Sequence, residues 1–331
     1  MDSAAGPCVG RAQAQTRPHA GGAAAGRFCG SPGGGSLNAE QIAKLRALNY
    51  RRTAKQRVRT VEEARAFVEQ VGFCHFWPIK GIETPNLFHA IAGRVRSVPN
   101  EHDDPDISKC WGWKDHALDK RWWYYGKLLR RRATMVSLDL LPYFYALSEN
   151  YGELDDYLGE YLSGTMTAEA KRIYEALLEH GPLDTIRLRR EARLSASSAK
   201  SLFERALVEL QVGFKVLPIG VAEAGAWRYA FKYELLQRHF PELPEQARPI
   251  KRSEARRALV LRYLDNVVAA ERRMVEKVFH VFKWTSTELE RTIAALQDEG
   301  AIREVEIKGL DHPQLLSARA LDQARYMFTT P

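Results

Sequence analysis

Apolar positions along residues 165–234 follow a regular order of helices and strands. Ile173 and Leu177 recur at helical spacing, and Gly181-Pro182 is a signal that ends the helix they belong to. A short helix and a longer helix with an apolar face are predicted next. Residues 227–233 then alternate large aromatic rings with other side chains, which is typical of a half-buried strand. The pattern predicts three helices followed by a β-hairpin.

The same order returns about 86 residues later. There Thr285 and Glu288 have the spacing of a capping box, and a short strand is predicted over 302–307. A related pattern begins near Asn38, which is placed to cap a helix, and continues with a capping box that opens a helix over 60–72. This order is the winged helix-turn-helix layout. We therefore expect a mainly α fold with short β-hairpins, of the α+β class, built from tandem winged helix-turn-helix modules.

The pattern divides the chain into segments of different character. Nothing in the Gly/Ala-rich beginning of the chain can bury enough apolar surface to offset the entropy of ordering, so we expect a disordered tail there. The expected segments are a tail over 1–36, a first winged-helix-like module over 37–99, a helical and aromatic insert over 100–164, a second module over 165–250 and a third over 251–331.

Composition excludes several classes of protein. The chain has 331 residues, of which 45% are hydrophobic, yet no stretch approaches the roughly 20 apolar residues of a membrane span. Its four cysteines are too scattered for a disulfide scaffold, and no Cys-x-x-Cys zinc pattern occurs. We expect no metal, no cofactor and no membrane partner, and a location in the bacterial cytoplasm.

The net charge is +8, and the basic residues are clustered in two runs along the chain. Lys44–Arg59 holds seven basic and no acidic residues, and Lys120–Arg132 holds six and none. The second run lies among tryptophans such as Trp111, and aromatic rings beside cations suit an unpaired nucleic-acid base. The alternative is that most of these rings form core. Basic clusters of this kind favour a polyanionic partner.

Double-stranded DNA, contacted mainly at its phosphates, is the partner that a winged-helix layout favours. Its third helix normally enters the major groove, and hydroxyl groups near a helix N-terminus suit phosphate. The alternative is that these residues are ordinary caps and solvated faces. The candidate DNA-binding residues are Lys55, Arg57, Arg59, Arg130, Arg131, Arg132, Ser197, Ser198, Lys200, Arg205, Lys283, Thr285, Thr287 and Arg291.

Catalytic motifs are scarce. The chain has no phosphate-binding Gly-x-x-x-x-Gly-Lys loop, no His-Glu-x-x-His and no Gly-x-Ser-x-Gly, and its nine histidines show no ligand spacing. Asp115 adjoins the tryptophans, and a carboxylate beside aromatic rings can act as a base.

Two stretches carry a family resemblance. Gly181-Pro182-Leu-Asp-Thr-Ile-Arg-Leu-Arg189 opens the second module, and Val71-Gly-Phe-Cys-His-Phe-Trp-Pro78 closes the first. With the module order, over roughly residues 38–308, the chain resembles the AlkZ/YcaQ-type bacterial DNA glycosylases. This resemblance implies binding to DNA and removal of alkylated or crosslinked bases.

The resemblance places the family's Gln-x-Asp or Gln-x-Gln catalytic motif at His75 and Trp77. Tryptophan can neither activate water nor stabilise a cationic sugar, and a neutral imidazole supports such a centre poorly. Either the chemistry has moved, for example to Glu83 or Asp115, or this branch binds DNA without removing the base.

Three functions therefore remain open. The first is a DNA-binding protein related to repair glycosylases, which we expect to be a monomer. As an enzyme it would hydrolyse N-glycosidic bonds as a metal-independent monofunctional glycosylase. The second is a transcriptional regulator, which predicts a dimer although the chain offers no heptad seam. The third is a protein-interaction scaffold.

Overall fold

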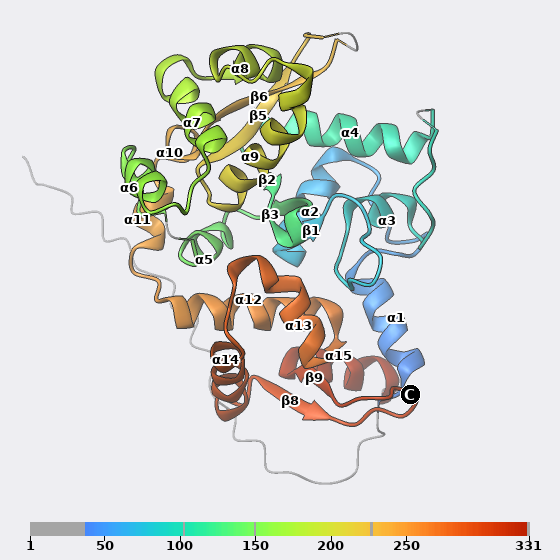
Figure 1. Ribbon diagram of the computed structural model, residues 1–331. Helices are drawn as coiled ribbons and strands as arrows, with labels where there is room; N and C mark the ends of the chain where they lie inside the picture. Colours follow the sequence, from blue (N-terminus) through green and yellow to red (C-terminus); the bar gives the residue numbers. More distant parts are fainter. Residues whose placement is uncertain (1–36, 102, 149, 226–227, 330–331) are drawn as a thin grey trace, which may run out of the picture. The chain divides into compact units, whose positions relative to one another are not determined.

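Within the described part of the chain, one arrangement of helices and strands occurs three times (Figure 1). The structure is a computed structural model that describes residues 37–329 apart from 102, 149 and 226–227, so the expected tail over 1–36 lies outside the described residues. Each copy runs as helix, short strand, two helices and an antiparallel hairpin. In each copy the short strand pairs with the last strand of the hairpin. The fold is mainly helical with small antiparallel sheets, as the hydrophobic pattern predicts.

The first copy crosses an expected segment boundary. Its elements are α2 (Val61–Val71), β1 (Phe73–His75), α3 (Leu87–Ala92), α4 (Pro105–Leu118), β2 (Tyr124–Lys127) and β3 (Ala133–Val136). Phe73 of β1 and Tyr124 of β2 both lie opposite Val136 of β3. The boundary expected between residues 99 and 100 therefore runs through this copy. Residues 105–136 supply its third helix and hairpin and do not form a separate insert.

The other two copies have the same element order. The second consists of α7 (Ala168–His180), β4 (Leu183–Asp184), α8 (Thr185–Glu191), η2 (Ser197–Ala199), α9 (Lys200–Val212), β5 (Val216–Ala222) and β6 (Ala230–Leu235). The third consists of α12 (Arg252–Val267), β7 (Ala269–Ala270), α13 (Arg272–Phe279), η3 (His280–Phe282), α14 (Ser286–Asp298), β8 (Ile302–Val305) and β9 (Gln314–Ser317). The remaining elements are α1 (Ala39–Asn49), η1 (Leu129–Arg131), α5 (Leu141–Tyr145), α6 (Asp156–Leu162), α10 (Leu236–His239), α11 (Leu243–Ala247) and α15 (Ala318–Thr329).

Capping residues set the helix starts, as the sequence predicts. Thr285 and Glu288 form a complete capping box at α14. Asn38 caps α1 by accepting the N–H of Gln41. Thr60 accepts the N–H of Glu63 at α2, but the Glu63 carboxylate accepts the N–H of Arg59 and so does not complete the predicted box. Each cap satisfies backbone donors that have no partner inside the helix.

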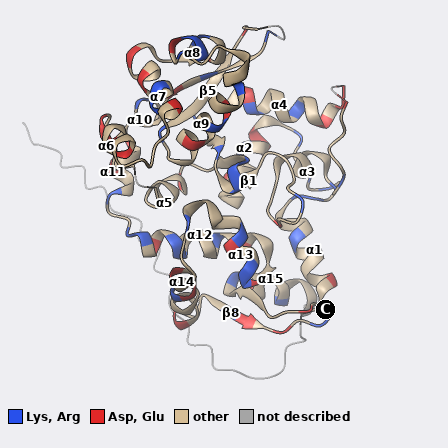
Figure 2. Cartoon of the chain, in the orientation of Figure 1, with Lys and Arg blue, Asp and Glu red and all other residues tan. Residues whose placement is uncertain are grey.

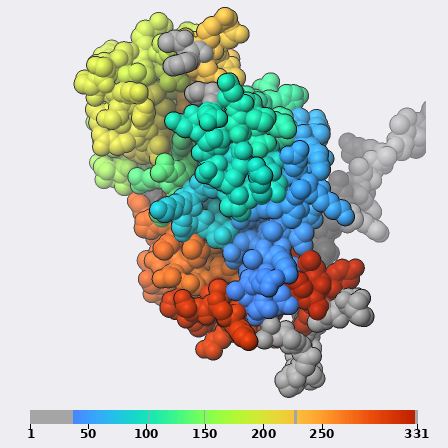
Figure 3. All heavy atoms as spheres, turned by 90° about the vertical axis from the view of Figure 1, so that its right-hand side faces the viewer, coloured from blue at the N-terminus to red at the C-terminus, as the bar shows by residue number. Residues whose placement is uncertain are grey.

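The first copy packs against both of the others. In Figure 3 its blue-to-teal atoms lie between the yellow-green second copy and the orange third copy. On the third-copy side, the buried Asn266 donates its Nδ2–H to the carbonyl oxygen of Val71 at 2.6 Å. On the second-copy side, the Tyr124 hydroxyl donates to the carbonyl of Gln211 at 3.2 Å. Both contacts hold β1 and the first hairpin in place.

Gly72 joins α2 to β1 with φ at +76°, and a Cβ there would lie 2.9 Å from Leu140 Cδ2 and 3.1 Å from Arg262 Cγ. We predict that Gly72→Ala lowers the free energy of unfolding by about 2–3 kcal/mol, through backbone strain and the clash together. Urea denaturation measures this loss. Gly81→Ala is the matched control, because φ is +74° there and nothing lies within 4 Å. It should cost only about 1 kcal/mol, and equal losses at the two positions would contradict the prediction.

Candidate nucleic-acid interface

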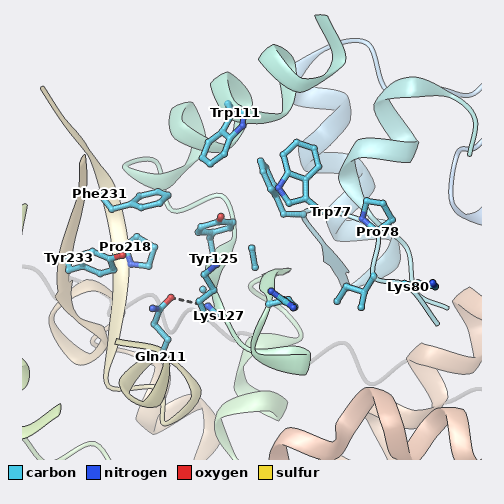
Figure 4. A pocket seen from close by; sticks show the side chains of 15 residues that line it. Trp77, Pro78, Lys80, Trp111, Tyr125, Lys127, Gln211, Pro218, Phe231 and Tyr233 are labelled. Atoms are coloured by element: carbon cyan, nitrogen blue, oxygen red, sulfur yellow. Dashed lines mark hydrogen bonds between the residues drawn. The ribbon is translucent and has the colours of Figure 1, made fainter. Parts of the chain in front are cut away.

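A cleft lined by aromatic rings lies where the first and second copies meet (Figure 4). Its volume is about 350 Å³. The segment after β1, helix α4, the first hairpin, the end of α9 and the hairpin β5–β6 all contribute to it. We call it the aromatic cleft, and its aromatic lining residues are Phe76, Trp77, Trp111, Tyr125, Phe231 and Tyr233.

The rings of the aromatic cleft support one another edge to face. The ring centroids of Phe76 and Trp77 are 4.6 Å apart, those of Phe76 and Trp111 are 5.4 Å apart, and those of Trp77 and Trp111 are 6.4 Å apart. Trp111 is 37% exposed, whereas Phe76 is buried. Edge-to-face packing of this kind fixes ring orientation and leaves part of the ring surface free for a planar ligand.

Every charged side chain among the residues that line the aromatic cleft is basic. These side chains are Lys80, Lys127 and Arg132, and all three are exposed. The polar Gln211 is buried and already paired, because its Oε1 accepts the N–H of Lys127 at 2.9 Å and its Nε2–H donates to the carbonyl of Leu207 at 3.0 Å. The lining therefore combines apolar rings with positive charge.

A buried lysine lies directly behind the wall of the aromatic cleft. Lys114 Nζ is 4.2 Å from the ring centroids of both Trp111 and Phe231. It also lies 2.7 Å from Asp115 Oδ1 and donates to the Tyr229 hydroxyl at 2.7 Å. Burial lowers the pKa of Lys114 to about 8, although the carboxylate of Asp115 opposes that shift. The ammonium thus adds to the positive charge of the cleft.

His75 lies inside the core. Its side chain is fully buried, with Nδ1 2.8 Å from Thr84 Oγ1 and Nε2 3.3 Å from the carbonyl oxygen of Leu129. A carbonyl only accepts, so Nε2 carries the proton and Nδ1 accepts from the Thr84 hydroxyl. Burial lowers the pKa of His75 to about 4. Both ring nitrogens have partners in the protein, and none is left to position a water molecule.

Trp77 and the two candidate carboxylates are in three different environments. Trp77 is half-buried and lines the aromatic cleft. Glu83 is paired with Arg46 at 3.5 Å and Arg52 at 3.3 Å, and it is not among the lining residues. Asp115 is paired with Lys114, and its Oδ1 also accepts from the Tyr229 hydroxyl at 3.0 Å. In the described part of the chain, no three His, Cys, Asp or Glu side chains are grouped to hold a metal ion.

The three consecutive arginines lie in the tight turn of the first hairpin, and all are exposed. Arg132 lines the aromatic cleft, and Arg130 donates to the carbonyl of Lys277 in α13 at 3.2 Å. Figure 2 shows basic residues gathered where α13 faces β1. Arg130 and Arg131 both have φ of +54°, a left-handed conformation that side chains other than glycine adopt rarely.

The other candidate DNA-binding residues lie on separate surfaces. Arg57 is half-buried, and Lys55 and Arg59 are exposed in the loop between α1 and α2. The remaining ones are exposed near the starts of α9 and α14, and they are Ser197, Ser198, Lys200, Arg205, Lys283, Thr285, Thr287 and Arg291. Helix α9 reaches the aromatic cleft only with its far end, at Gln211. No described hydrogen bond or ion pair joins these groups to the cleft.

Comparison with known proteins identifies the family. Residues 58–280 match the model of a family described as AlkZ related, which is more than half of the chain. This chain belongs to the AlkZ-related family. A solved structure similar to this AlkZ-related chain is the DNA glycosylase AlkZ of Streptomyces sahachiroi, with a TM-score of 0.53 and 11% sequence identity. The likeness covers 88% of this chain and 72% of that one, and it shows a shared fold. No curated protein sequence matches the chain.

Several residues of the cleft escaped the sequence analysis. Lys80 belongs to no motif, Lys127 was counted only within the basic run Lys120–Arg132, and Lys114 has the surroundings of a buried lysine only in the folded chain. The alternating rings of residues 227–233 were a usable signal, since Phe231 and Tyr233 line the cleft.

Among the described residues, no helix is long and apolar enough to cross a membrane.

We predict that His75→Gln changes the pH dependence of stability in the AlkZ-related chain. In wild type between about pH 4 and 6.5, the unfolded state binds the His75 proton and the folded state does not, so lowering the pH favours unfolding. By pH 4 this loss amounts to about 3 kcal/mol. The variant lacks it, so the difference in unfolding free energy between the two proteins shifts in favour of the variant. If the unfolding free energies of wild type and His75→Gln changed in parallel from pH 7 to pH 4, the conclusion that His75 is buried and neutral in the folded protein would be contradicted.

Proposed function

We propose that the chain binds damaged double-stranded DNA and stacks an unpaired base in the aromatic cleft. The observation that carries the proposal is the lining of the cleft, in which partly exposed rings such as Trp111 lie among side chains whose only charges are positive. Aromatic faces stack on any base, and basic side chains hold the adjoining phosphates. Membership of a family related to a DNA glycosylase supports DNA as the partner.

The turn at Arg130–Arg131 is the proposed phosphate contact beside the cleft. Left-handed backbone at two successive side-chain-bearing residues costs roughly 1–2 kcal/mol each, and asparagine-glycine is the usual sequence for such a turn. Strain of this kind is typical of functional positions. The turn presents two guanidinium groups next to Arg132, which lines the cleft.

We propose further that each copy is a winged helix. Helices α4, α9 and α14 would then be the third helices, and Trp111 belongs to the first of them. The exposed residues at the starts of α9 and α14 would contact phosphates along the duplex, mostly without reading sequence. The monomeric state and the cytoplasmic location expected from the sequence belong to this proposal.

Binding without base removal at the family motif is the activity that these residues support. His75 has no free ring nitrogen, and Trp77 has no ionisable group. We therefore expect damaged duplex to be bound tightly and to yield no abasic product that depends on His75. Abasic product from an alkylated duplex that disappears in His75→Ala would overturn this part of the proposal.

The double variant Arg130→Gly with Arg131→Gly tests the phosphate contact. Glycine adopts positive φ freely, and the strain that is relieved offsets the lost Arg130 hydrogen bond to Lys277, so we predict an unfolding free energy within about 1 kcal/mol of wild type. Affinity for a duplex with one unpaired base should nevertheless fall roughly tenfold. The slope of log affinity against log salt concentration should become shallower by the amount expected for the loss of about two phosphate contacts. Fluorescence anisotropy across a salt series measures both quantities.

Arg193→Gly is the matched control, because Arg193 is an exposed arginine with φ of +56° in the second copy and away from the cleft. It removes one charge and relieves the same kind of strain, and we expect its DNA affinity to remain near that of wild type. An affinity unaltered in the double variant, or lowered equally in the control, would reject the turn as a specific phosphate contact.

A further inference from the structure

The ammonium of Lys114 is placed to control what kind of base the aromatic cleft accepts. Its Nζ lies 4.2 Å from the centroids of Trp111 and Phe231, two rings that line the cleft from different copies. Tyr125, a third lining residue, has its ring centroid 5.5 Å from the same nitrogen. The side chain itself is fully buried, so the charge acts through the rings and touches no ligand.

Asp115 cancels this charge only in part inside the cleft. Its carboxylate pairs with Lys114 at 2.7 Å, but its side chain is 19% exposed and it is not among the lining residues. The Tyr229 hydroxyl accepts a hydrogen bond from Lys114 and donates one to Asp115. The positive end of the ion pair therefore lies against the rings of the cleft, and the negative end is partly screened by water.

The other charges of the cleft have the same sign. Lys80, Lys127 and Arg132 line it, and no carboxylate does. The position that the family resemblance assigns to a carboxylate or amide is occupied by Trp77, so the negative charge that would favour a cationic base is missing there as well.

We infer that Lys114 makes the aromatic cleft selective for bases without a positive charge, so that neutral or anionic bases bind and cationic N-alkylated purines are disfavoured. The inference rests on the proposed function, because it requires a base in the cleft. At an effective dielectric constant of about 20, a unit charge roughly 8 Å from the ammonium is repelled by it and attracted by the more distant Asp115 carboxylate, and the net repulsion weakens binding about two- to threefold.

The test uses two bases of nearly the same shape and different charge. Duplexes carry a single unpaired 7-methylguanine, which is cationic, or 7-methyl-7-deazaguanine, which is neutral. Binding is measured by anisotropy at about pH 6, where 7-methylguanine keeps its charge and Lys114, with its pKa of about 8, is protonated. Wild type should bind the neutral base about two- to threefold more tightly. Equal affinities, or a preference for the cationic base, would overturn the inference.

Variants of Lys114 identify the source of the selectivity. Lys114→Met should reduce the affinity ratio toward one, whereas Lys114→Arg should keep it, and thermal melting identifies any variant that fails to fold. Lys120→Met is the control, because Lys120 is exposed just beyond the end of α4. It should leave the ratio unchanged. A folded Lys114→Met protein with the wild-type ratio would reject Lys114 as the determinant.

Trp111→Ala separates failure of the inference from failure of the proposed function. If the base stacks in the cleft, this variant weakens binding of both duplexes. If Trp111→Ala leaves both affinities unchanged, the cleft does not hold the base and the proposed function fails. If it weakens both while wild type shows no preference for the neutral base, only the selectivity fails.

Discussion

The hydrogen bonds of Gln211 hold the first hairpin against the end of α9, and the aromatic cleft depends on them. The buried side chain accepts the N–H of Lys127, and the Gln211 carbonyl accepts the hydroxyl proton of Tyr124. Backbone and side chain of one residue thus bind two positions of the same strand. A buried polar group that lost these partners would cost about 1–3 kcal/mol, which favours a single arrangement of the two copies. The rings of the cleft come from both copies and meet because this contact is fixed.

The sequence was sufficient to predict elements whose signals are local. Thr285 with Glu288 forms the capping box expected of it, Asn38 caps its helix as expected, and the aromatic alternation near Phe231 marks a strand. The extent of the first copy was not predictable in this way. Strand β1 pairs with β3 about 60 residues later, and neither strand exceeds four residues, so the pairing left no periodic pattern to detect.

For individual site residues too, the sequence predicts local properties but not contacts between distant parts of the chain. Arg130 to Arg132 are all exposed, which agrees with the rule that three successive arginines cannot all be buried. His75 and Trp77 were placed together on a motif, and positions two apart would share a face in a continuous strand, but β1 ends at His75 and the chain turns there. His75 packs toward Leu129 while Trp77 faces the cleft. The role of Lys114 depends on rings from α4, β2 and β6, which no sequence window contains.

The central proposal is that an unpaired base stacks on the rings of the aromatic cleft. The most direct test is the fluorescence of 2-aminopurine placed at a single unpaired position of a duplex, measured as protein is added. Stacking on Trp77 and Trp111 predicts that the emission is quenched on binding, and that a fully paired duplex of the same sequence shows no such change. A rise in emission on binding, or no change at saturation, would mean that the base is not stacked in the cleft and would contradict the proposal.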